Sequence, residues 1–191
     1  MALLERTDAL TAIRTKVEAG ERLDFADGVS LMESDDILGL GELADLARRV
    51  RGGDDRVYFV QNLYLNQTNV CRVKCKFCAF AVTRKQTDAY TYTAEELVAD
   101  AVRQHELTSF SEIHMVGGES PHVGFDYYVD IVRSLHEALP EVHLKLFTAS
   151  EIHHMTTLSG LSHEEVLREL RDVGLGSLPG GGAEVFADRV R

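Results

Sequence analysis

The chain has 191 residues, 45% of them hydrophobic and 27% charged, which is the composition of an ordinary globular protein with a packed core and excludes the disordered and fibrous classes. Its formal charge of −11, from 20 Lys and Arg against 31 Asp and Glu, repels phosphate backbones and disfavours nucleic acid as a partner. No apolar run approaches the ~20 residues of a membrane helix, and the N-terminus lacks a signal segment, so we expect a cytoplasmic protein without a membrane partner.

The first 55 residues predict a helical N-terminal extension. Apolar residues recur at helical spacing over residues 3–17 and again over 37–50, and the second run ends at Gly52 and Gly53. Residues 56–191 predict a second part of a different kind.

This second part alternates between predicted strands and predicted helices. Short unbroken runs of β-branched, aromatic and other apolar residues are typical of strands buried in a parallel sheet, and they occur at residues 57–65, 112–116 and 142–149, with a fourth beginning at 175–178. Helices are predicted from capping boxes at residues 93–96 and 162–165, and from apolar residues at helical spacing over 128–139.

The order of these elements predicts an α/β fold with right-handed βαβ crossovers, in which the loops at the carboxyl ends of the strands carry the function. Three cysteines, the tripeptide Gly117-Gly118-Glu119 and the pair Ser150-Glu151 all follow predicted strands. About three strand–helix units would leave the last strand with an exposed edge. We therefore expect residues 56–191 to be the N-terminal half of a (β/α) barrel core that is truncated, with its C-terminal part missing.

The three cysteines, Cys71, Cys75 and Cys78, all fall within eight consecutive residues. An odd, tightly clustered set does not suit the disulfide framework of a secreted domain, so a reducing compartment and a metal site are the better interpretation. Four thiolates are the usual ligands of a 4Fe-4S cube. Three leave one iron free to bind a small molecule, as the open position of a catalytic zinc site does.

Other uses of the same cysteines stay open at this point. A zinc site completed by a histidine, or three thiols that serve only as small buried residues, would need no iron. An electron-transfer cluster with a ligand from outside the chain is a further alternative, although a small electron carrier does not need a βα scaffold.

The run CRVKCKFC at residues 71–78 resembles the cluster loop of the radical S-adenosylmethionine (SAM) superfamily, and Phe77 occupies that family's aromatic position. The resemblance implies that the cysteines hold a 4Fe-4S cluster whose open iron is chelated by the methionine end of SAM, and that reduction releases methionine and a 5'-deoxyadenosyl radical. It also implies that residues 117–119 are the superfamily's second-strand motif, which engages the methionine amino group.

Longer stretches resemble the aminofutalosine (aminodeoxyfutalosine) synthase family of the futalosine route to menaquinone, namely VYFVQNLYLNQTNVCRVKCKFCAF, LFTASEIHHMTTLSGL and LPGGGAEVFADRVR. This implies a radical SAM transferase that adds the 5'-deoxyadenosyl radical to 3-(1-carboxyvinyloxy)benzoate. The products would be 6-amino-6-deoxyfutalosine, methionine and bicarbonate. SAM is then consumed as a co-substrate, and an external one-electron reductant of the flavodoxin or ferredoxin type is required.

Several polar residues are candidates for binding these molecules. Arg84 and Lys85 are candidates for the two substrate carboxylates, because unpaired charges in a dry site are costly, although basic loop residues are commonly just solvated. Glu151 is a candidate for the ribose or the methionine end of SAM. His153 and His154 suit acid–base chemistry, but adjacent side chains point in different directions, and local packing or capping is an equal alternative.

The glycine triplet at residues 180–182, with Glu184, is a last candidate, for cradling the nucleoside through backbone donors. Such a triplet is also a common flexible turn. No catalytic residue is assigned from the sequence.

Three alternatives to this function stay open. The first is a related radical SAM enzyme, either a futalosine cyclase or a deazaflavin-forming synthase. The second is a non-enzymatic iron–sulfur electron carrier. The third is that the chain, as a fragment with an unfinished barrel, is itself inactive.

Overall fold

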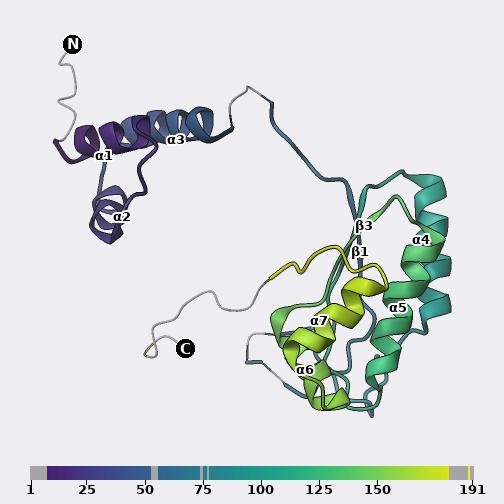
Figure 1. Cartoon of the computed structure of the whole chain (residues 1–191). Helices are drawn as coiled ribbons and strands as arrows, with labels where there is room; N and C mark the ends of the chain where they lie inside the picture. The colour runs from purple at the N-terminus through teal and green to yellow at the C-terminus, as the bar shows by residue number, and fades with distance from the viewer. Residues whose placement is uncertain (1–7, 53–55, 74, 77, 181–188, 190–191) are drawn as a thin grey trace. The chain divides into compact units, whose positions relative to one another are not determined.

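A computed structural model describes residues 8–52, 56–73, 75–76, 78–180 and 189 of the chain. The chain divides into two compact units, Met1–Tyr58 and Phe59–Arg191 (Figure 1). Each unit has its own buried hydrophobic cluster, so each is described by itself.

The first unit consists of the helices α1 (Asp8–Glu18), α2 (Phe25–Met32) and α3 (Ile37–Gly52). Helices α1 and α3 coincide with the two predicted helical runs, apart from residues 3–7, which lie outside the described residues. Helix α2 was missed, because its 8 residues are too few for helical periodicity to be recognised. Its start is nevertheless a capping box, formed by the side chains of Asp24 and Asp27.

The second unit is an open sheet of three parallel strands in the order β1-β2-β3, with four helices. The strands are β1 (Asn62–Leu65), β2 (Glu112–Met115) and β3 (His143–Leu146). The helices are α4 (Ala94–Leu107), α5 (Phe125–Ala138), α6 (Ala149–Ser159) and α7 (His163–Asp172). This arrangement confirms the predicted α/β fold with an unclosed parallel sheet.

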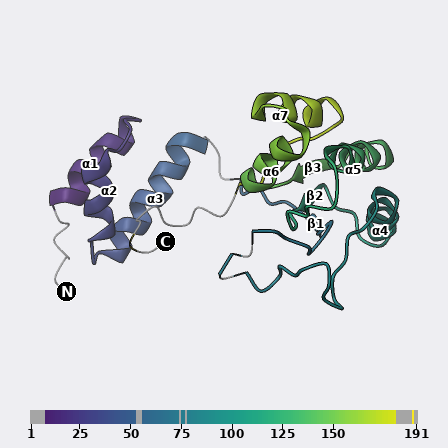
Figure 2. The same ribbon diagram turned by 90° about the horizontal axis from the view of Figure 1, so that it is seen from below.

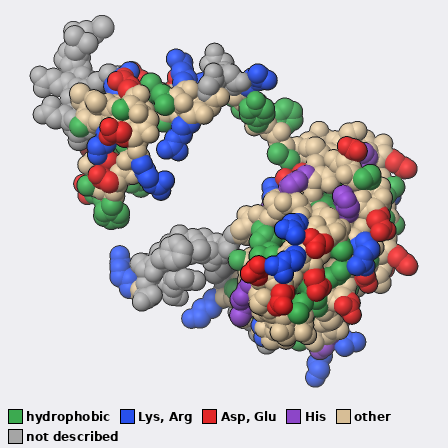
Figure 3. Space-filling model, in the orientation of Figure 1, with side chains coloured by type: hydrophobic (Ala, Val, Ile, Leu, Met, Phe, Trp, Pro, Cys, Tyr) green, Lys and Arg blue, Asp and Glu red, His purple; other side chains and the backbone are tan. Residues whose placement is uncertain are grey.

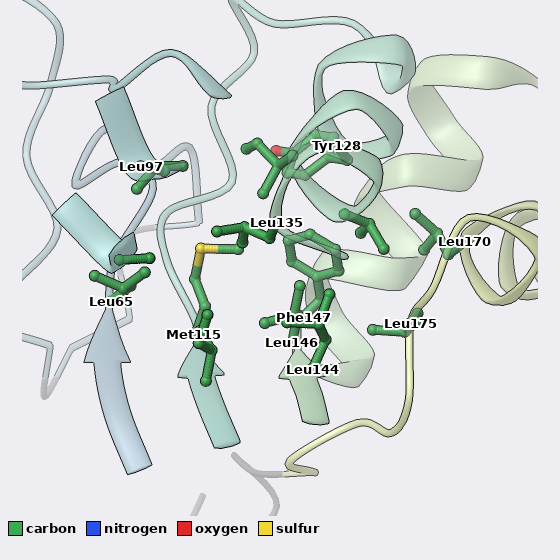
Figure 4. Packing of buried hydrophobic residues seen from close by; sticks show 14 of the residues in the cluster. Leu65, Leu97, Met115, Tyr128, Leu135, Leu144, Leu146, Phe147, Leu170 and Leu175 are labelled. Atoms are coloured by element: carbon green, nitrogen blue, oxygen red, sulfur yellow. The ribbon is translucent and has the colours of Figure 1, made fainter. Parts of the chain in front are cut away.

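One face of the sheet is covered by helices, which form an arc beside the strands in Figure 2. Side chains alternate along each strand, so that neighbouring residues of the three strands enter the core together. Leu65, Met115 and Leu146 are paired in register and lie between the strands and the helices in Figure 4. The core therefore fixes where each strand ends, and with it where the following loops begin.

The first predicted strand is too long at its start. Residues 57–60 are exposed, from 57% at Val60 to 87% at Phe59, and the ladder to β2 begins only with Asn62 opposite Glu112. A run of apolar residues can extend beyond the strand that it predicts, because pairing also requires a partner.

The third and fourth predicted strands also need correction. Ala149, predicted as the end of a strand, is the first residue of helix α6, because Phe147 takes a positive φ of 66° and turns the chain out of the sheet. Residues 175–178 do not form a strand. Their contribution is an isolated bridge between Ser177 and Lys145.

Among the described residues, no helix combines the length and the apolar character needed to cross a bilayer. On the face of the second unit seen in Figure 3, acidic and basic side chains are interspersed. The formal charge of −11 is therefore not gathered into one acidic patch on that face.

Candidate functional site

The cysteine loop follows β1. Backbone hydrogen bonds join the start of the loop to its far end at Val82, and we call residues 67–70, which lead into it, the root of the loop. The N–H of Cys71 donates to the carbonyl of Val82 at 3.1 Å, and the N–H of Val82 donates to the carbonyl of Asn69 at 2.9 Å. The buried side chain of Asn69 also bonds the backbone of Asp88 and Tyr90. The loop thus leaves and re-enters the fold at one fixed point.

The three cysteines are free thiols, half-buried at Cys71 and exposed at Cys75 and Cys78. A 3.0 Å hydrogen bond from the N–H of Cys78 to the carbonyl of Cys75 closes a tight turn between the last two. Phe77, the predicted aromatic position, lies outside the described residues. Among the residues that the structure describes, no three or more His, Cys, Asp or Glu side chains converge at metal-binding spacing.

Gly117 and Gly118 bring the end of β2 into contact with the root of the cysteine loop. A Cβ on Gly118 would lie 2.3 Å from the carbonyl oxygen of Val70, and one on Gly117 would lie 2.5 Å from the side chain of Gln67. The N–H of Gly118 donates to the carbonyl of Thr68 at 2.7 Å. Only glycine permits this approach of two backbones.

Glu119 is buried, and its carboxylate is already engaged by protein groups. The Ser150 hydroxyl donates to one carboxylate oxygen, and Nε of Arg72 lies 3.3 Å from the other. The backbone N–H of Arg72 also donates to the Glu119 carbonyl at 3.0 Å. Arg72, the residue after the first cysteine, therefore links the cysteine loop to the second-strand motif. It was not identified from the sequence. Its position inside the CRVKC run was the only signal.

Glu151 is 2% exposed and lies in the first turn of α6. Its carboxylate accepts hydrogen bonds from the Thr148 N–H at 2.7 Å, the Thr148 hydroxyl at 2.9 Å, the Gln67 amide at 2.9 Å and the Gly117 N–H at 3.1 Å. Burial raises the pKa of Glu151, and the donors from Thr148, Gln67 and Gly117 oppose that rise. This geometry favours a structural role, and direct contact with SAM stays a prediction.

His153 and His154 point to different surroundings, as neighbouring helix residues must. His154 is buried, and its Nε2 donates to the carbonyl of Ser120 at 3.0 Å, while Nδ1 lies 4.0 Å from Glu119 and has no hydrogen-bond partner among the described groups. His153 is exposed and stacks on the ring of His163. Of the two, His154 is the one that the fold brings to the strand ends.

The other predicted candidates lie apart from this cluster or outside the described residues. Arg84 and Lys85 are exposed in a turn just after the cysteine loop. Gly180 is described, with a φ of 73°, whereas residues 181–182 and Glu184 are not among the described residues.

Tyr128 is a buried residue of the site that sequence reasoning took only for core. Its ring packs edge-on against Phe147, with the centroids 5.5 Å apart, and its hydroxyl has no partner among the described groups. Burial raises the pKa of Tyr128, and the nearby carboxylate of Glu151 raises it further. The hydroxyl is therefore a neutral group beside the two buried glutamates.

A separate cavity of about 500 Å³ lies at the edge of β1 and does not include the cysteines. Three tyrosines, Tyr64, Tyr90 and Tyr92, line it together with Glu96 and Asp100. These carboxylates already bond the Thr93 N–H and Arg103. We place the candidate site at the strand ends, because the thiols and the buried polar cluster are there.

The donor set of the site fits an iron–sulfur cluster. Thiolates are the ligands that such clusters use, and the two exposed cysteines are accessible to a metal. The close approach at Gly118 holds the second-strand motif beside the root of the same loop. These residues can therefore hold a three-thiolate cluster next to a buried carboxylate.

Comparison with known proteins gives a family match over most of the chain. The family described as the Radical SAM superfamily matches residues 65–191. A solved structure described as HydG, a maturase of the [FeFe]-hydrogenase, superposes with a TM-score of 0.64 at 17% identity, covering 91% of this chain and 36% of that one. At this identity the likeness concerns the fold alone.

Three relatives are similar along nearly the whole chain. Aminodeoxyfutalosine synthase of Streptomyces coelicolor is 48% identical over 94% of this chain and 46% of its own length. The protein of the same name from Thermus thermophilus is 41% identical over 97% and 50%. Cyclic dehypoxanthine futalosine synthase of Halalkalibacterium halodurans is 33% identical over 96% and 49%. The chain thus spans about half the length of these relatives.

Proposed function

Because this chain belongs to the radical SAM superfamily, we propose that Cys71, Cys75 and Cys78 hold a 4Fe-4S cluster and that the adjacent strand ends bind SAM. Three thiolates leave one iron without a protein ligand. When bound, the cluster supplies the electron that splits SAM into methionine and a 5'-deoxyadenosyl radical. The protein's own part is to orient SAM and to exclude water.

The residues after β2 are suited to the methionine amino group of SAM. An ammonium group needs acceptors, and the N–H groups of Gly117 and Gly118 are already used within the protein. The acceptors at this turn are the carbonyl oxygens of Gly117 and Gly118 and the carboxylate of Glu119. The two oxygens of that carboxylate can each accept a further hydrogen bond beside those from Ser150 and Arg72. We therefore assign Glu119 to the ammonium group, with Arg72 and Ser150 holding its carboxylate in place.

For the reaction itself, we propose the addition of the 5'-deoxyadenosyl radical to 3-(1-carboxyvinyloxy)benzoate, which gives 6-amino-6-deoxyfutalosine and bicarbonate. The observation that carries this assignment is the 48% and 41% identity to two aminodeoxyfutalosine synthases. The substrate has two carboxylates, and Arg84 and Lys85 are exposed cations just after the cysteine loop that suit one of them. An external one-electron reductant completes the proposal.

Two further proposals concern the chain and its setting. We propose that residues 1–55 form an N-terminal extension and that residues 56–191 form the N-terminal half of the barrel core. A reducing, cytoplasmic compartment suits the two exposed free thiols, because oxidising compartments favour disulfides.

The test is anaerobic reconstitution of the chain with iron and sulfide, followed by chemical reduction in the presence of SAM and the enolpyruvyl benzoate. An adenine-containing adduct identified by mass spectrometry, together with methionine, supports the proposal. Uptake of zinc without an iron cluster contradicts the cluster assignment. A cluster that leaves SAM uncleaved under reduction identifies an electron carrier.

A second candidate function is that of a related radical SAM enzyme, favoured by the 33% identity to a cyclic dehypoxanthine futalosine synthase. It predicts SAM cleavage without an adduct to the enolpyruvyl benzoate, and accumulation of 5'-deoxyadenosine. The same incubation therefore separates the two candidates.

A further inference from the structure

The first two turns of α6 contact the turn at residues 117–120 through three side chains. These contacts are the Ser150 hydroxyl on the Glu119 carboxylate, the Glu151 carboxylate on the Gly117 N–H, and the His154 ring on the Ser120 carbonyl. All three side chains come from less than two helical turns. One helix therefore contacts Gly117, Glu119 and Ser120 of this turn at the same time.

Glu151 is the centre of this arrangement because it bonds to three segments at once. One oxygen accepts the hydrogen bonds of Gln67, from the root of the cysteine loop, and of Gly117, from the second-strand motif. The other oxygen accepts both donors of Thr148, which caps α6. Among the described residues no cation lies at hydrogen-bond distance from this buried carboxylate, so these donors offset the cost of its desolvation. Its satisfaction therefore depends on the three segments being in place.

The backbone before α6 is held in a conformation that a bulky residue rarely adopts. Phe147 has a φ of 66°, which is costly for any residue with a Cβ. Its N–H donates to the carbonyl of Met115 at 2.8 Å, and its ring is buried against Tyr128. The surrounding contacts enforce this turn, which aims the start of α6 at the 117–120 turn.

Helix α7 shows what an ordinary capping box does in the same unit. Ser162 and Glu165 make the same reciprocal hydrogen bonds as Thr148 and Glu151. Glu165 is exposed, and its carboxylate accepts hydrogen bonds from the N–H and the hydroxyl of Ser162, within its own capping box. Glu151 therefore makes two contacts, to Gln67 and Gly117, that capping a helix does not require.

We propose that Ser150, Glu151 and His154 form a positioning clamp, the α6 clamp, which holds the 117–120 turn against the root of the cysteine loop. The clamp sets the place of Glu119 relative to the cysteines. Its link to SAM rests on the proposed function, whereas its contacts do not. Glu151 is thus a positioning residue that acts through Gly117 and Gln67.

The test compares Glu151→Gln with Glu165→Gln in the full chain. A glutamine at 151 offers one acceptor oxygen and one amide that can only donate, so either the Thr148 donors or the Gly117 and Gln67 donors lose their acceptor. The Glu165→Gln variant disrupts a capping box of the same kind without touching the motif. Thermal unfolding of both variants shows how much stability each change removes.

Hydrogen exchange of the metal-free chain, followed by NMR, is the first readout. We expect the Gly117 amide to exchange about tenfold to one-hundredfold faster in Glu151→Ala, which removes both carboxylate oxygens, since a buried donor then loses its acceptor. It should keep its wild-type rate in Glu165→Gln. A wild-type rate at Gly117 in Glu151→Ala overturns the clamp, whether or not the chain binds a cluster.

The second readout is the EPR spectrum of the reduced cluster during titration with SAM. We expect Glu151→Gln to retain wild-type iron and to require about tenfold more SAM for the spectral change, a shift of the size that one lost buried contact produces. Ser150→Ala, which removes a second contact of the clamp, should shift the titration in the same direction. An unshifted titration in both variants overturns the positioning role. A wild-type chain without a four-iron cluster refutes the proposed function instead, and leaves the exchange result to decide on the clamp.

Discussion

The side-chain amide of Gln67 donates a 2.9 Å hydrogen bond to the carboxylate of Glu151, and this bond is buried although 84 residues separate the two in the chain. Gln67 follows β1 and Glu151 follows β3, so the bond spans the carboxyl ends of the sheet. The Gly117 N–H, after the middle strand, donates to the same carboxylate oxygen. One oxygen atom thus joins the ends of all three strands.

Replacing Gln67 by methionine should destabilise the second unit. The change keeps the side chain's length but removes one donor from a buried carboxylate, so we expect a loss of about 1–3 kcal/mol in the free energy of unfolding. Urea unfolding measures it. Gln61→Met, at an exposed position, is the control and should stay within about 0.5 kcal/mol of the wild type. Equal midpoints for the two variants would show that the Gln67 bond contributes nothing.

Gly118→Ala should displace the second-strand motif from the cysteine loop. The new methyl group would lie 2.3 Å from the carbonyl oxygen of Val70, and because backbone atoms cannot rotate away, we expect a cost of at least about 1–3 kcal/mol. Chemical unfolding and iron uptake are the measurements. Gly124→Ala meets nothing within 4 Å and should alter the capping of α5 by less than about 1 kcal/mol. A Gly118→Ala variant as stable as Gly124→Ala contradicts this close contact.

The free energy of unfolding should depend on pH in a way that Glu151 determines in part. Burial raises its pKa above the ordinary value of 4.5. At a pH between the pKa of the unfolded state and the higher pKa of the folded state, the folded chain therefore binds more protons than the unfolded chain. The contribution of Glu151 to the free energy of unfolding therefore decreases as pH rises from the unfolded pKa through the folded one. In Glu151→Gln this decrease should be absent when unfolding is measured from pH 4 to 8.

Glu165 provides the opposite case for the same measurement. The Ser162 N–H, which donates to its carboxylate, lowers the pKa of Glu165. Its contribution is therefore present above the unfolded pKa and is lost as pH falls through the folded one. Glu165→Gln should remove a slope of the opposite sign, and two slopes of the same sign would contradict the assignment.

Tyr127 and Tyr128 should respond differently to loss of their hydroxyls. Tyr128→Phe removes a buried hydroxyl without a partner among the described groups and keeps the ring contact, so stability should stay equal or rise by up to about 1 kcal/mol. Tyr127→Phe loses a 2.7 Å hydrogen bond to the carbonyl of Tyr92 and should cost about 0.5–1.5 kcal/mol. Thermal unfolding of both variants checks the pair. A clear loss in Tyr128→Phe would reveal a partner for that hydroxyl.

Cys75→Ser should separate cluster binding from folding. The thiol is exposed, so unfolding of the metal-free chain should change by no more than about 0.5 kcal/mol. Iron and sulfide retained after reconstitution and desalting should fall to a small fraction of the wild-type content, because a serine oxygen is a poor substitute for a thiolate. Unchanged iron content would contradict the assignment of Cys75 as a ligand.

The sequence by itself determined the fold class, the family and the order of the elements. Alternation of short apolar runs with capping boxes predicted the α/β sheet, because those signals act within a few residues. The spacing of Cys71, Cys75 and Cys78 indicated the radical SAM superfamily, which the family match confirms. Both kinds of information are local along the chain.

Only the tertiary structure decided where the strands stop and what the polar residues at their ends do. Residues 57–60 have strand-like composition but pair with no strand in the described part of the chain, and Phe147 leaves the sheet with its ring packed against Tyr128 of α5. The sequence left His153 and His154 equivalent and assigned Glu151 to SAM, yet burial separates the two histidines and surrounds Glu151 with donors. These outcomes depend on contacts between residues far apart in the chain, and no local pattern encodes which distant donor meets a buried carboxylate.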